Sequence, residues 1–310
     1  MKDVGLDRLT VGVLCGGNSS ERTISLRSGR AVLEALGRSG VLVRRIDPRN
    51  LRQAQAILPQ IDLAFIALHG KGGEDGSIQR HLERAKIPYV GSDPHGSRLA
   101  FDKVQAKRVF EEERIPTPRW KVFGRNNWRD LKKFPTPFFV KPTADGSSIG
   151  VFLVEDFRRS AEKIMHALDR YGVLLAERRI EGREFTVGIL GNRALPVVEL
   201  RPKRVFYDYQ AKYTPGMTEY LVPAPISGTW SRKVRGLAVR VHRALGLRDF
   251  SRVDIVSDKE GNPFVLEANT IPGFTELSLL PKAAREAGIS FESLCLRLVK
   301  MALGRKNGKA

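Results

Sequence analysis

The spacing of apolar residues over the first ninety positions alternates between the pattern of strands and that of helices. Short apolar runs at "LTVGVLC", "VLVRRI" and "IDLAFIAL" predict strands, and amphipathic stretches near 20–36, 50–58 and 76–85 predict the helices between them. This alternation favours a doubly wound α/β domain with a parallel sheet. Ligands of such sheets bind beyond the carboxyl ends of the strands, which is where the loops "GGNSSE" and "HGKGGEDG" lie.

The remainder of the chain predicts an α+β arrangement. A helix over about 97–114 precedes the Pro-rich segment "IPTP", which suits a domain boundary near residue 95 or a little later. The strand "PFFVKP", the loop "TADGSSIG", the strand "VFLVE", a helix over about 157–171 and the strand "VLLAERRI" then form a compact module. Further strands, a helix near 229–245 and two final helices complete the chain.

Residues 252–269 predict an antiparallel hairpin, because "RVDIV" and "FVLEAN" alternate with period two around the turn "SDKEGN". A loop of two or four residues pairs Val253 with Leu266. One face then carries Val253, Ile255, Phe264, Leu266 and Ala268, and the other carries Arg252, Asp254, Val265, Glu267 and Asn269. Two carboxylates and an amide oxygen suit Mg²⁺. The alternative is a solvated hairpin face with an incidental Arg–Glu pair.

Composition limits the classes of protein. No apolar run of the 310 residues approaches the roughly 20 that a membrane helix needs, and "MKDVGLDRLT" lacks the apolar stretch of a signal peptide, so we expect a cytoplasmic protein without a membrane partner. Cys15 and Cys295 lie in apolar and amphipathic segments, which predicts buried thiols rather than a disulfide or a metal pair.

The net charge raises the question of a nucleic-acid partner. Lys and Arg number 53 against 34 Asp and Glu, a formal charge of +19. The cations are spread along the chain, however, with no zinc-finger spacing and no aromatic RNP-like run, so no specific nucleic acid is expected. Neither glycine-rich loop matches the dinucleotide or Walker pattern.

Several charged residues are candidates for binding a nucleotide. Lys141 ends an apolar strand and precedes the small-residue loop "ADGSSI", an arrangement that suits phosphate as well as an ordinary exposed turn. Lys103 in "AFDKVQAK" is either a second phosphate ligand or a helix surface charge. Glu177 and Glu184 lie near a strand pair, where carboxylates can bind an adenine amino group and a ribose diol, although their spacing alone is a weak signal.

Taken together, eight motifs in order resemble the D-alanine:D-alanine ligases of the ATP-grasp superfamily, from about residue 10 to residue 303. They are "GGNSSE", "ALHGKGGEDG", "DK", "VKPTADGSSIG", "YDYQAKY", "RVDI", "LEANTIPG" and "ELSLLP". The resemblance implies an N-terminal doubly wound parallel-sheet domain followed by a two-part ATP-grasp fold. It implies a first-substrate domain over 1–95, a central α+β subdomain over 96–181 and a C-terminal subdomain with the metal site over 182–310.

The resemblance also implies roles for individual residues in a nucleotide site. Asp254, Glu267 and Asn269 are then ligands of two Mg²⁺ or Mn²⁺ ions that bridge the β- and γ-phosphates of ATP. The implied ATP contacts are Lys103, Lys141, Ser147, Ser148, Glu177, Glu184 and Lys212.

A second set of residues corresponds to the substrate contacts of the family. Glu21 is implied to pair with the ammonium of the first D-alanine, and Tyr213 with Ser147 to complete a hydrogen-bonded trio that closes the site. The other implied substrate and catalytic residues are His69, Arg252 and Gly273, the last two for the oxyanion, and Ser278 with Leu279 for the second carboxylate.

The function that follows is ATP-dependent joining of two D-alanines through an acyl phosphate, for the peptidoglycan precursor, by a homodimeric enzyme. A D-alanine:D-lactate or D-alanine:D-serine ligase is the alternative, and "YDYQAKY" favours the dipeptide enzyme. A basic nucleic-acid-binding protein that has kept only the fold is a third interpretation. Glu276 in "TELS" departs from the Ser-His pair of many relatives and leaves the specificity for the second substrate open.

Overall fold

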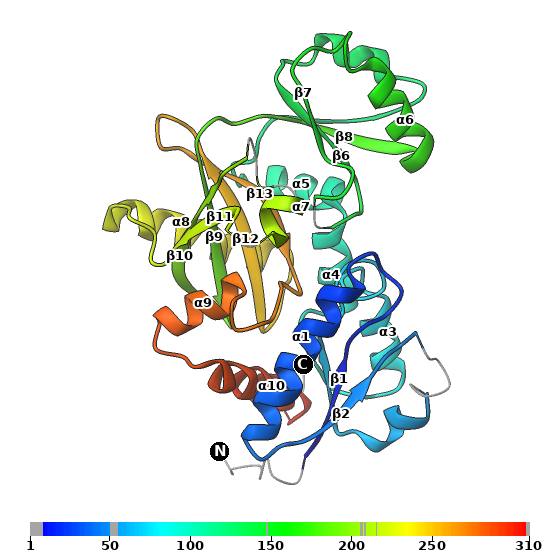
Figure 1. Cartoon of the computed structure of the whole chain (residues 1–310), viewed down its shortest axis with the longest axis vertical. Coiled ribbons are helices and arrows are strands. Elements are labelled where there is room, and N and C mark those ends of the chain that lie inside the picture. Colours follow the sequence, from blue (N-terminus) through cyan, green and yellow to red (C-terminus); the bar gives the residue numbers. More distant parts are fainter. Residues whose placement is uncertain are drawn as a thin grey trace.

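The computed structural model describes residues 9–49, 55–146, 148–204, 207, 209–214 and 216–307, without the side chains of Tyr209, Tyr213, Lys306 and Asn307. Three sheets follow one another along the long axis of the molecule, as Figure 1 shows. The N-terminal sheet lies at one end, the sheet of residues 120–178 at the other, and the sheet of residues 183–269 lies between them.

The N-terminal sheet is parallel, as the alternating pattern predicted. Its strands, in spatial order, are β2 (Leu42–Ile46), β1 (Thr10–Leu14), β3 (Leu63–Ile66) and β4 (Tyr89–Val90). The connections contain α1 (Arg22–Arg38), the 3₁₀ turn η2 (Leu58–Gln60) and α3 (Ser77–Arg84). Every residue of β3 is buried, as expected for a parallel strand that is covered on both faces. Most of the short helix predicted at 50–58 lies outside the described residues.

The single helix predicted over 97–114 is wrong, because the segment forms two helices, α4 (Pro94–Phe101) and α5 (Lys103–Glu112). Asp102 between them has an extended backbone, and its carboxylate accepts hydrogen bonds from the N–H groups of Val104 and Gln105 at 2.9 and 3.2 Å. This side chain caps α5 and makes the break favourable. The amide of Lys103 then donates to Thr143 O at 2.8 Å, which places the start of α5 beside the loop that follows Lys141.

The sheet of residues 120–178 is called the central sheet here because it is the second along the chain. It is antiparallel, and the module that contains it has a core of its own. In spatial order its strands are β5 (Trp120–Gly124), β8 (Val173–Arg178), β6 (Phe138–Pro142) and β7 (Phe152–Val154). The remaining elements of this module are the 3₁₀ turn η3 (Trp128–Lys133) and α6 (Ala161–Tyr171). The apolar pattern did not reveal β5, because most of its residues are only partly buried and it follows a Pro-rich segment.

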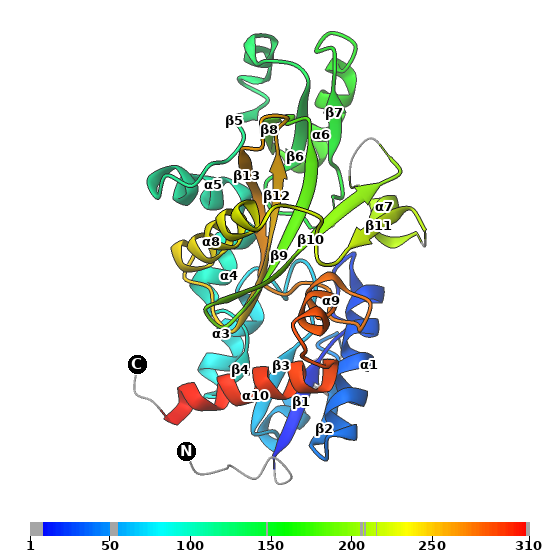
Figure 2. The same cartoon turned by 90° about the vertical axis from the view of Figure 1, so that its left-hand side faces the viewer.

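The C-terminal sheet is also antiparallel and is packed on both faces. Its strands, in spatial order, are β11 (Thr218–Leu221), β10 (Arg193–Pro202), β9 (Arg183–Leu190), β12 (Phe250–Ser257) and β13 (Pro263–Asn269). The other elements are α7 (Tyr209–Tyr213), α8 (Gly228–Ala244), α9 (Leu279–Glu286) and α10 (Phe291–Asn307). Val197 packs with the core under α8, and Val198 packs on the opposite face with α9 and α10. Figure 2 shows α8 and α9 on opposite sides of this sheet.

The hairpin forms as predicted, but its register differs at one point. Val253 pairs with Ala268 and Asp254 with Glu267, whereas Ile255 pairs with Val265, so Leu266 is the extra residue of a bulge and the predicted Val253–Leu266 pair is wrong. The bulge changes the phase of alternation. Val265 is therefore wholly buried instead of lying on the hairpin face that carries Asp254 and Glu267. Leu266 turns to the cavity described below.

Phe274 joins the N-terminal and C-terminal parts of the molecule. It is 1% exposed, and its ring lies 5.5–5.6 Å from those of Phe65 on β3, Phe250 on β12 and Phe291 on α10. These two parts thus share one core, whereas the central module has a separate one. Each predicted unit contains one of the three sheets, while the boundaries at 95 and 181 stay predictions.

The two cysteines and the helices agree with the expectations from composition. Cys15 and Cys295 are buried free thiols, and burial raises the pKa of Cys15 to about 11. Across the described part of the chain, no helix combines the length and the apolar character needed to cross a membrane.

Candidate active site

Two neighbouring cavities contain most of the residues selected from the sequence. The first lies between the central and C-terminal sheets and is lined by Lys103, Lys141, Ser148, Glu184, Lys212, Asp254 and Glu267. The second is lined by Glu21, His69, Lys212, Arg252, Asn269, Gly273, Ser278 and Leu279. Gly146, Tyr207 and Lys212 line both cavities, so a group bound in one can be reached from the other.

Asp254 is fixed by a set of donors at the boundary of the two cavities. Arg252 donates to both carboxylate oxygens at 2.9 Å, Thr186 Oγ1 donates to Oδ1 at 2.6 Å, and Asn269 Nδ2 donates to Oδ2 at 3.0 Å. The partner strand places Glu267 directly opposite Asp254. Like charges in such a pair repel each other unless cations lie nearby.

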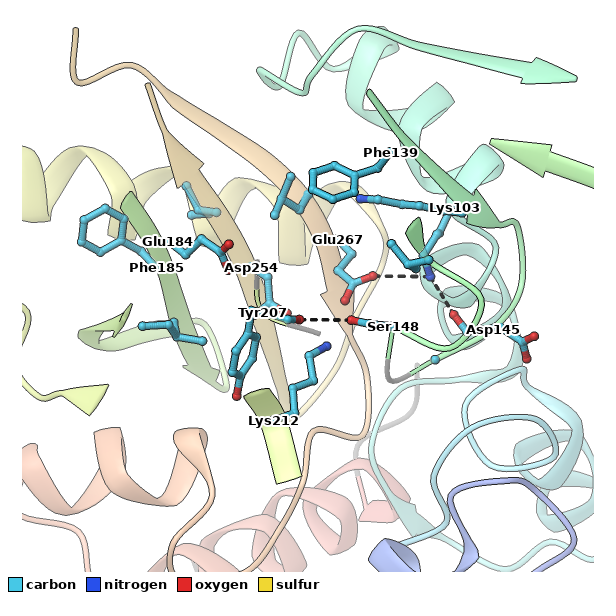
Figure 3. Close-up of a pocket in the computed structure, with 16 residues that line it drawn as sticks. Lys103, Phe139, Asp145, Ser148, Glu184, Phe185, Tyr207, Lys212, Asp254 and Glu267 are labelled. Atoms are coloured by element: carbon cyan, nitrogen blue, oxygen red, sulfur yellow. Dashed lines mark hydrogen bonds and ion pairs between the residues drawn. The ribbon is translucent and has the colours of Figure 1, made fainter. Parts of the chain in front are cut away.

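Lysines supply part of that positive charge, as Figure 3 shows. Lys103 Nζ lies 3.4 Å from Glu267 Oε2 and donates to the Asp145 carbonyl at 2.8 Å, while Lys212 extends from α7 toward the same space. Burial acts to raise the pKa of Glu267, but Lys103, Lys212, Lys141 and Arg252 outweigh burial and hold this pKa at about 2. The carboxylate is therefore ionised at neutral pH.

The hairpin residues fit hard divalent cations by their chemistry. The two carboxylates of the paired residues Asp254 and Glu267 offer oxygen donors, as does the amide of Asn269 two positions further along β13. Asn269 donates its N–H to Asp254, so its carbonyl oxygen is the atom available to a cation. Among the described residues, the hairpin included, no cluster of three or more His, Cys, Asp or Glu suits a metal ion, so the hairpin offers only two carboxylates with the amide of Asn269.

Glu177 does not line either cavity. Its carboxylate is enclosed between two lysines: one oxygen accepts a hydrogen bond from Lys141 Nζ, and the other lies 2.5 Å from Lys107 Nζ. Burial alone would raise the pKa of Glu177, but the two lysines lower it. Lys107 was not selected from the sequence, although its position one helical turn after Lys103 in "DKVQAK" was a usable signal.

Glu184 and Tyr207 also line the first cavity. Burial raises the pKa of Glu184, with Lys212 acting against it. Tyr207 was also missed by the sequence interpretation: its carbonyl accepts a hydrogen bond from Ser148 Oγ at 3.3 Å, and Lys212 Nζ lies 5.2 Å from the centre of its ring. The only signal for Tyr207 was its place at the start of "YDYQAKY".

Glu21 lies in the second cavity, with two glycines packed against it. A Cβ atom at Gly70 or Gly146 would lie 2.6 or 2.7 Å from Glu21 Oε2, so a side chain at either position would displace the end of the Glu21 side chain. The loop that carries Glu21 is held by Asp47, which accepts from the Gly17 amide at 3.0 Å and pairs with Arg22 at 2.7 Å.

His69 connects the N-terminal sheet to the loop that follows the hairpin. Its Nδ1 contacts the Ile271 carbonyl at 3.0 Å and its Nε2 contacts Ser28 Oγ at 2.9 Å, while Ser28 Oγ accepts from the Phe274 amide at 3.2 Å. Because the Ile271 carbonyl can only accept, Nδ1 carries a hydrogen and donates it in this contact. Through these bonds His69 positions the backbone on both sides of Gly273.

The remaining wall of the second cavity is the start of α9. Ser278 Oγ accepts from the Thr275 amide at 3.0 Å, and a Cβ at Gly273 would lie 3.3 Å from the same oxygen. Glu276, by contrast, is half exposed and faces Arg38 and Arg285 at 3.8 and 3.7 Å, and it does not line the cavity.

Two of the predicted roles fall on parts of the chain that are not described. Ser147 and the side chain of Tyr213 lie outside the described residues, so the predicted hydrogen-bonded trio with Glu21 stays a prediction.

Family models match most of the chain. The model described as "D-ala D-ala ligase C-terminus" matches residues 109–300, and "D-ala D-ala ligase N-terminus" matches residues 44–92. The chain belongs to the D-alanine–D-alanine ligase family. This confirms the resemblance, and with it an enzyme of the ligase class.

Curated relatives agree over nearly the full length. A D-alanine–D-alanine ligase of Acinetobacter baumannii (strain AYE) is 41% identical over 297 residues, which is 94% of this chain and 96% of the relative. The ligase of Geotalea uraniireducens (strain Rf4) is 44% identical over 295 residues, which is 94% of this chain and 95% of that protein.

Solved structures of ligases confirm the fold class. The D-alanine–D-alanine ligase of Bacillus anthracis complexed with ATP has a TM-score of 0.86 and 30% identity, covering 97% of this chain and 100% of that one. The VanG D-Ala:D-Ser ligase of Enterococcus faecalis has a TM-score of 0.83 and 28% identity, covering 95% of this chain and 99% of that one. The family's ATP-grasp fold, after an N-terminal parallel-sheet domain, is thus the fold of this chain.

Proposed function

We propose that this member of the D-alanine–D-alanine ligase family uses ATP to join two D-alanine molecules, releasing ADP and phosphate, and so supplies the dipeptide for the peptidoglycan precursor. The observation that carries the proposal is the adjacency of two cavities. One contains three lysines and two carboxylates suited to a metal–nucleotide complex, and the other contains Glu21, Arg252 and Gly273.

The first cavity suits ATP in both its apolar and its charged part. Phe139, Phe185 and Leu200 offer apolar surface for a flat base, while Lys103, Lys141 and Lys212 offer positive charge for phosphates. We assign Asp254, Glu267 and Asn269 to two Mg²⁺ or Mn²⁺ ions. When bound, such ions neutralise charge that spreads over the transferring phosphoryl group. The protein residues orient the reactants around that charge.

The second cavity suits two small zwitterions. The Glu21 carboxylate can pair with the ammonium of the first D-alanine, which directs the carboxylate of that substrate toward the shared boundary at Lys212. Because a carboxylate does not form an amide with an amine in water, it must first be phosphorylated. Lys212 lines both cavities, so it is placed to contact the phosphoryl group that passes between them.

Attack by the amine of the second D-alanine converts the acyl phosphate into a tetrahedral oxyanion. Arg252 lies in the second cavity with its guanidinium fixed by Asp254, and the Gly273 backbone lies on the same wall. A preorganised donor of this kind is typically worth about 3 kcal/mol of barrier. Ser278 and Leu279, where α9 begins, are then suited to the second carboxylate.

The second substrate separates this proposal from its nearest alternative. The VanG ligase, whose title describes a D-Ala:D-Ser enzyme, is also similar to the chain, so D-serine and D-lactate are competing acceptors. The segment "YDYQAKY" supports the dipeptide reaction.

A phosphate-release assay with MgATP tests these alternatives. D-alanine alone should support phosphate release. When D-lactate or D-serine is added, mass spectrometry should still show D-alanyl-D-alanine as the main product. If phosphate is released only when D-lactate or D-serine is added, the acceptor assignment is wrong. If no amino acid supports release, the ligase proposal itself fails.

Three further expectations accompany the proposal. A cytoplasmic location follows from the use of ATP, and a homodimer is expected from the resemblance to the family. No specific nucleic-acid partner is expected, because the cations are dispersed along the chain. Light scattering after size-exclusion chromatography tests the dimer, and a salt-dependent gel-shift assay tests for nucleic-acid binding.

A further inference from the structure

Lys107 on α5 is a charged residue buried behind the first cavity, and it is only 1% exposed. Its Nζ lies 2.5 Å from Glu177 Oε2 and donates a hydrogen bond to Thr117 Oγ1 at 2.6 Å. A buried ammonium group is costly unless it is paired and hydrogen-bonded. The reaction proposed above uses neither of these contacts, so they require a separate explanation.

The charges around Glu177 do not balance. One carboxylate lies between the ammonium groups of Lys107 and Lys141, which leaves one positive charge in excess. Lys107 is enclosed, whereas the side chain of Lys141 is 15% exposed and lines the first cavity. The excess charge is therefore presented to the cavity by Lys141.

We propose that Lys107 is a positioning residue for the nucleotide: it serves as the buried counter-charge of Glu177, so that Lys141 keeps a positive charge for phosphate. This inference rests on the proposed function, in which the first cavity binds ATP. Without Lys107, Lys141 would be the only cation in contact with Glu177 among the residues that the structure describes, and that carboxylate would neutralise its charge.

Lys107 also connects Glu177 to the hairpin that carries Asp254 and Glu267. Thr117 Oγ1, which accepts from Lys107, donates to Val265 O at 2.8 Å, and the Val265 amide donates to Pro116 O at 2.8 Å. Val265 lies two residues before Glu267 on β13. Lys103, one turn earlier on α5, contacts Glu267 itself. Helix α5 thus contacts Glu267 through Lys103, and Glu177 and Thr117 through Lys107.

The competing explanation is that Lys107 only braces these segments. The two explanations differ in what a variant does to phosphate binding. A brace is weakened equally by Lys107→Met and by Thr117→Val, whereas a counter-charge is lost only in Lys107→Met. Thr117→Val is therefore the matched control, because it breaks the link to Val265 and keeps the Lys107–Glu177 pair.

The test is calorimetry of MgATP binding together with the kinetic constants of the full chain. Lys107→Met should weaken MgATP binding and raise the KM for ATP by about ten- to a hundredfold, the effect of losing one charge-assisted contact. The KM for D-alanine should stay within about twofold. Lys107→Arg, which keeps the charge, should recover most of the affinity, and Thr117→Val should bind MgATP nearly as wild type.

A double variant keeps the test decisive if Lys107→Met folds poorly. Glu177→Gln removes the charge that Lys107 balances, so the Lys107→Met/Glu177→Gln double variant should bind MgATP about as tightly as Glu177→Gln alone. A folded double variant that binds MgATP tenfold or more weakly than Glu177→Gln would overturn the proposal, as would a folded Lys107→Met protein with wild-type affinity or a Thr117→Val protein as impaired as Lys107→Met. Wild type that binds no MgATP would instead refute the proposed function.

Discussion

At the scale of single residues, the chemistry of the candidate site depends on which partner each charged side chain has. Asp254 and Glu267 face one another across the hairpin, yet they differ in their partners. Asp254 is held by Arg252, Thr186 and Asn269, whereas Glu267 is approached by Lys103. Substitution at Glu267 therefore tests the metal assignment with little damage to the local hydrogen bonds.

We expect Glu267→Gln to lower turnover by orders of magnitude while the melting temperature stays near that of wild type. The amide cannot replace the carboxylate in the cation binding proposed for Glu267, but it removes a like charge opposite Asp254. Phosphate release and thermal melting measure the two effects. The exposed Glu260→Gln in the turn of the same hairpin is the control. Near-normal turnover in a folded Glu267→Gln protein would refute the metal role.

Glu276 provides the opposite prediction. Because its carboxylate faces Arg38 and Arg285 outside the cavity, Glu276→Gln should leave the KM for the second D-alanine within about twofold of wild type, as exposed ion pairs contribute little. Ser278→Ala, on the cavity wall, should raise that KM. Steady-state kinetics over a range of D-alanine concentrations measure both. A large change for Glu276→Gln would show that its charge reaches the acceptor.

At the scale of elements, local irregularities place the chemistry. The break at Asp102 starts α5 at Lys103, and the bulge at Leu266 separates the acid-bearing end of the hairpin from its core-facing end. In the N-terminal domain, the Arg22–Asp47 pair connects the start of α1 to the residue after β2 and holds the loop that leads to Glu21.

This last pair predicts a dependence of stability on pH. Burial acts to raise the pKa of Asp47, but the hydrogen bond from Arg22 and two backbone N–H groups lower it from 3.8 to about 2. A lowered pKa in the folded state stabilises the protein above pH 4, and this contribution, about 1–2 kcal/mol, is lost as the pH falls from 4 to 2.

Urea denaturation at several pH values measures this effect. Asp47→Asn should lower the free energy of unfolding at pH 6 and reduce the additional loss between pH 4 and pH 2, because the titrating group is absent. A variant as stable as wild type at pH 6, with an unchanged pH dependence, would contradict the assignment.

At the scale of the whole molecule, the N-terminal and C-terminal parts are packed together around Phe274, while the central module keeps a separate core. The first cavity lies where the central sheet meets the C-terminal sheet, and the second lies where the N-terminal domain meets the C-terminal part. Each cavity thus forms between parts of the chain that are distant in sequence.

Phe274→Ala should lower the free energy of unfolding by about 3–5 kcal/mol, since it leaves a cavity among three aromatic rings. The substitution should also raise the KM for D-alanine more than the KM for ATP, because Gly273, the residue before Phe274, lines the second cavity. Denaturant unfolding and steady-state kinetics measure these changes. Phe123→Ala, in the separate core of the central module, is the control and should not affect the KM for D-alanine selectively.

The sequence by itself determined what depends on near neighbours along the chain. Alternation of strands and helices predicted the parallel sheet, period-two alternation predicted the hairpin, and eight short motifs identified the family. The same motifs supplied the candidate site residues, most of which line the two cavities. Each of these signals spans a few residues, and its meaning follows from backbone geometry or from local chemistry.

Only the tertiary structure decided which distant residues meet. The partnership of Lys107 with Glu177, 70 positions later, the contact of Tyr207 with Ser148, and the position of Glu276 outside the cavity all depend on how three sheets pack. The hairpin register also needed the structure, because a bulge of one residue leaves the apolar pattern nearly unchanged and yet moves Val265 into the core. Local patterns carry no information about such contacts, since packing sets their free energy.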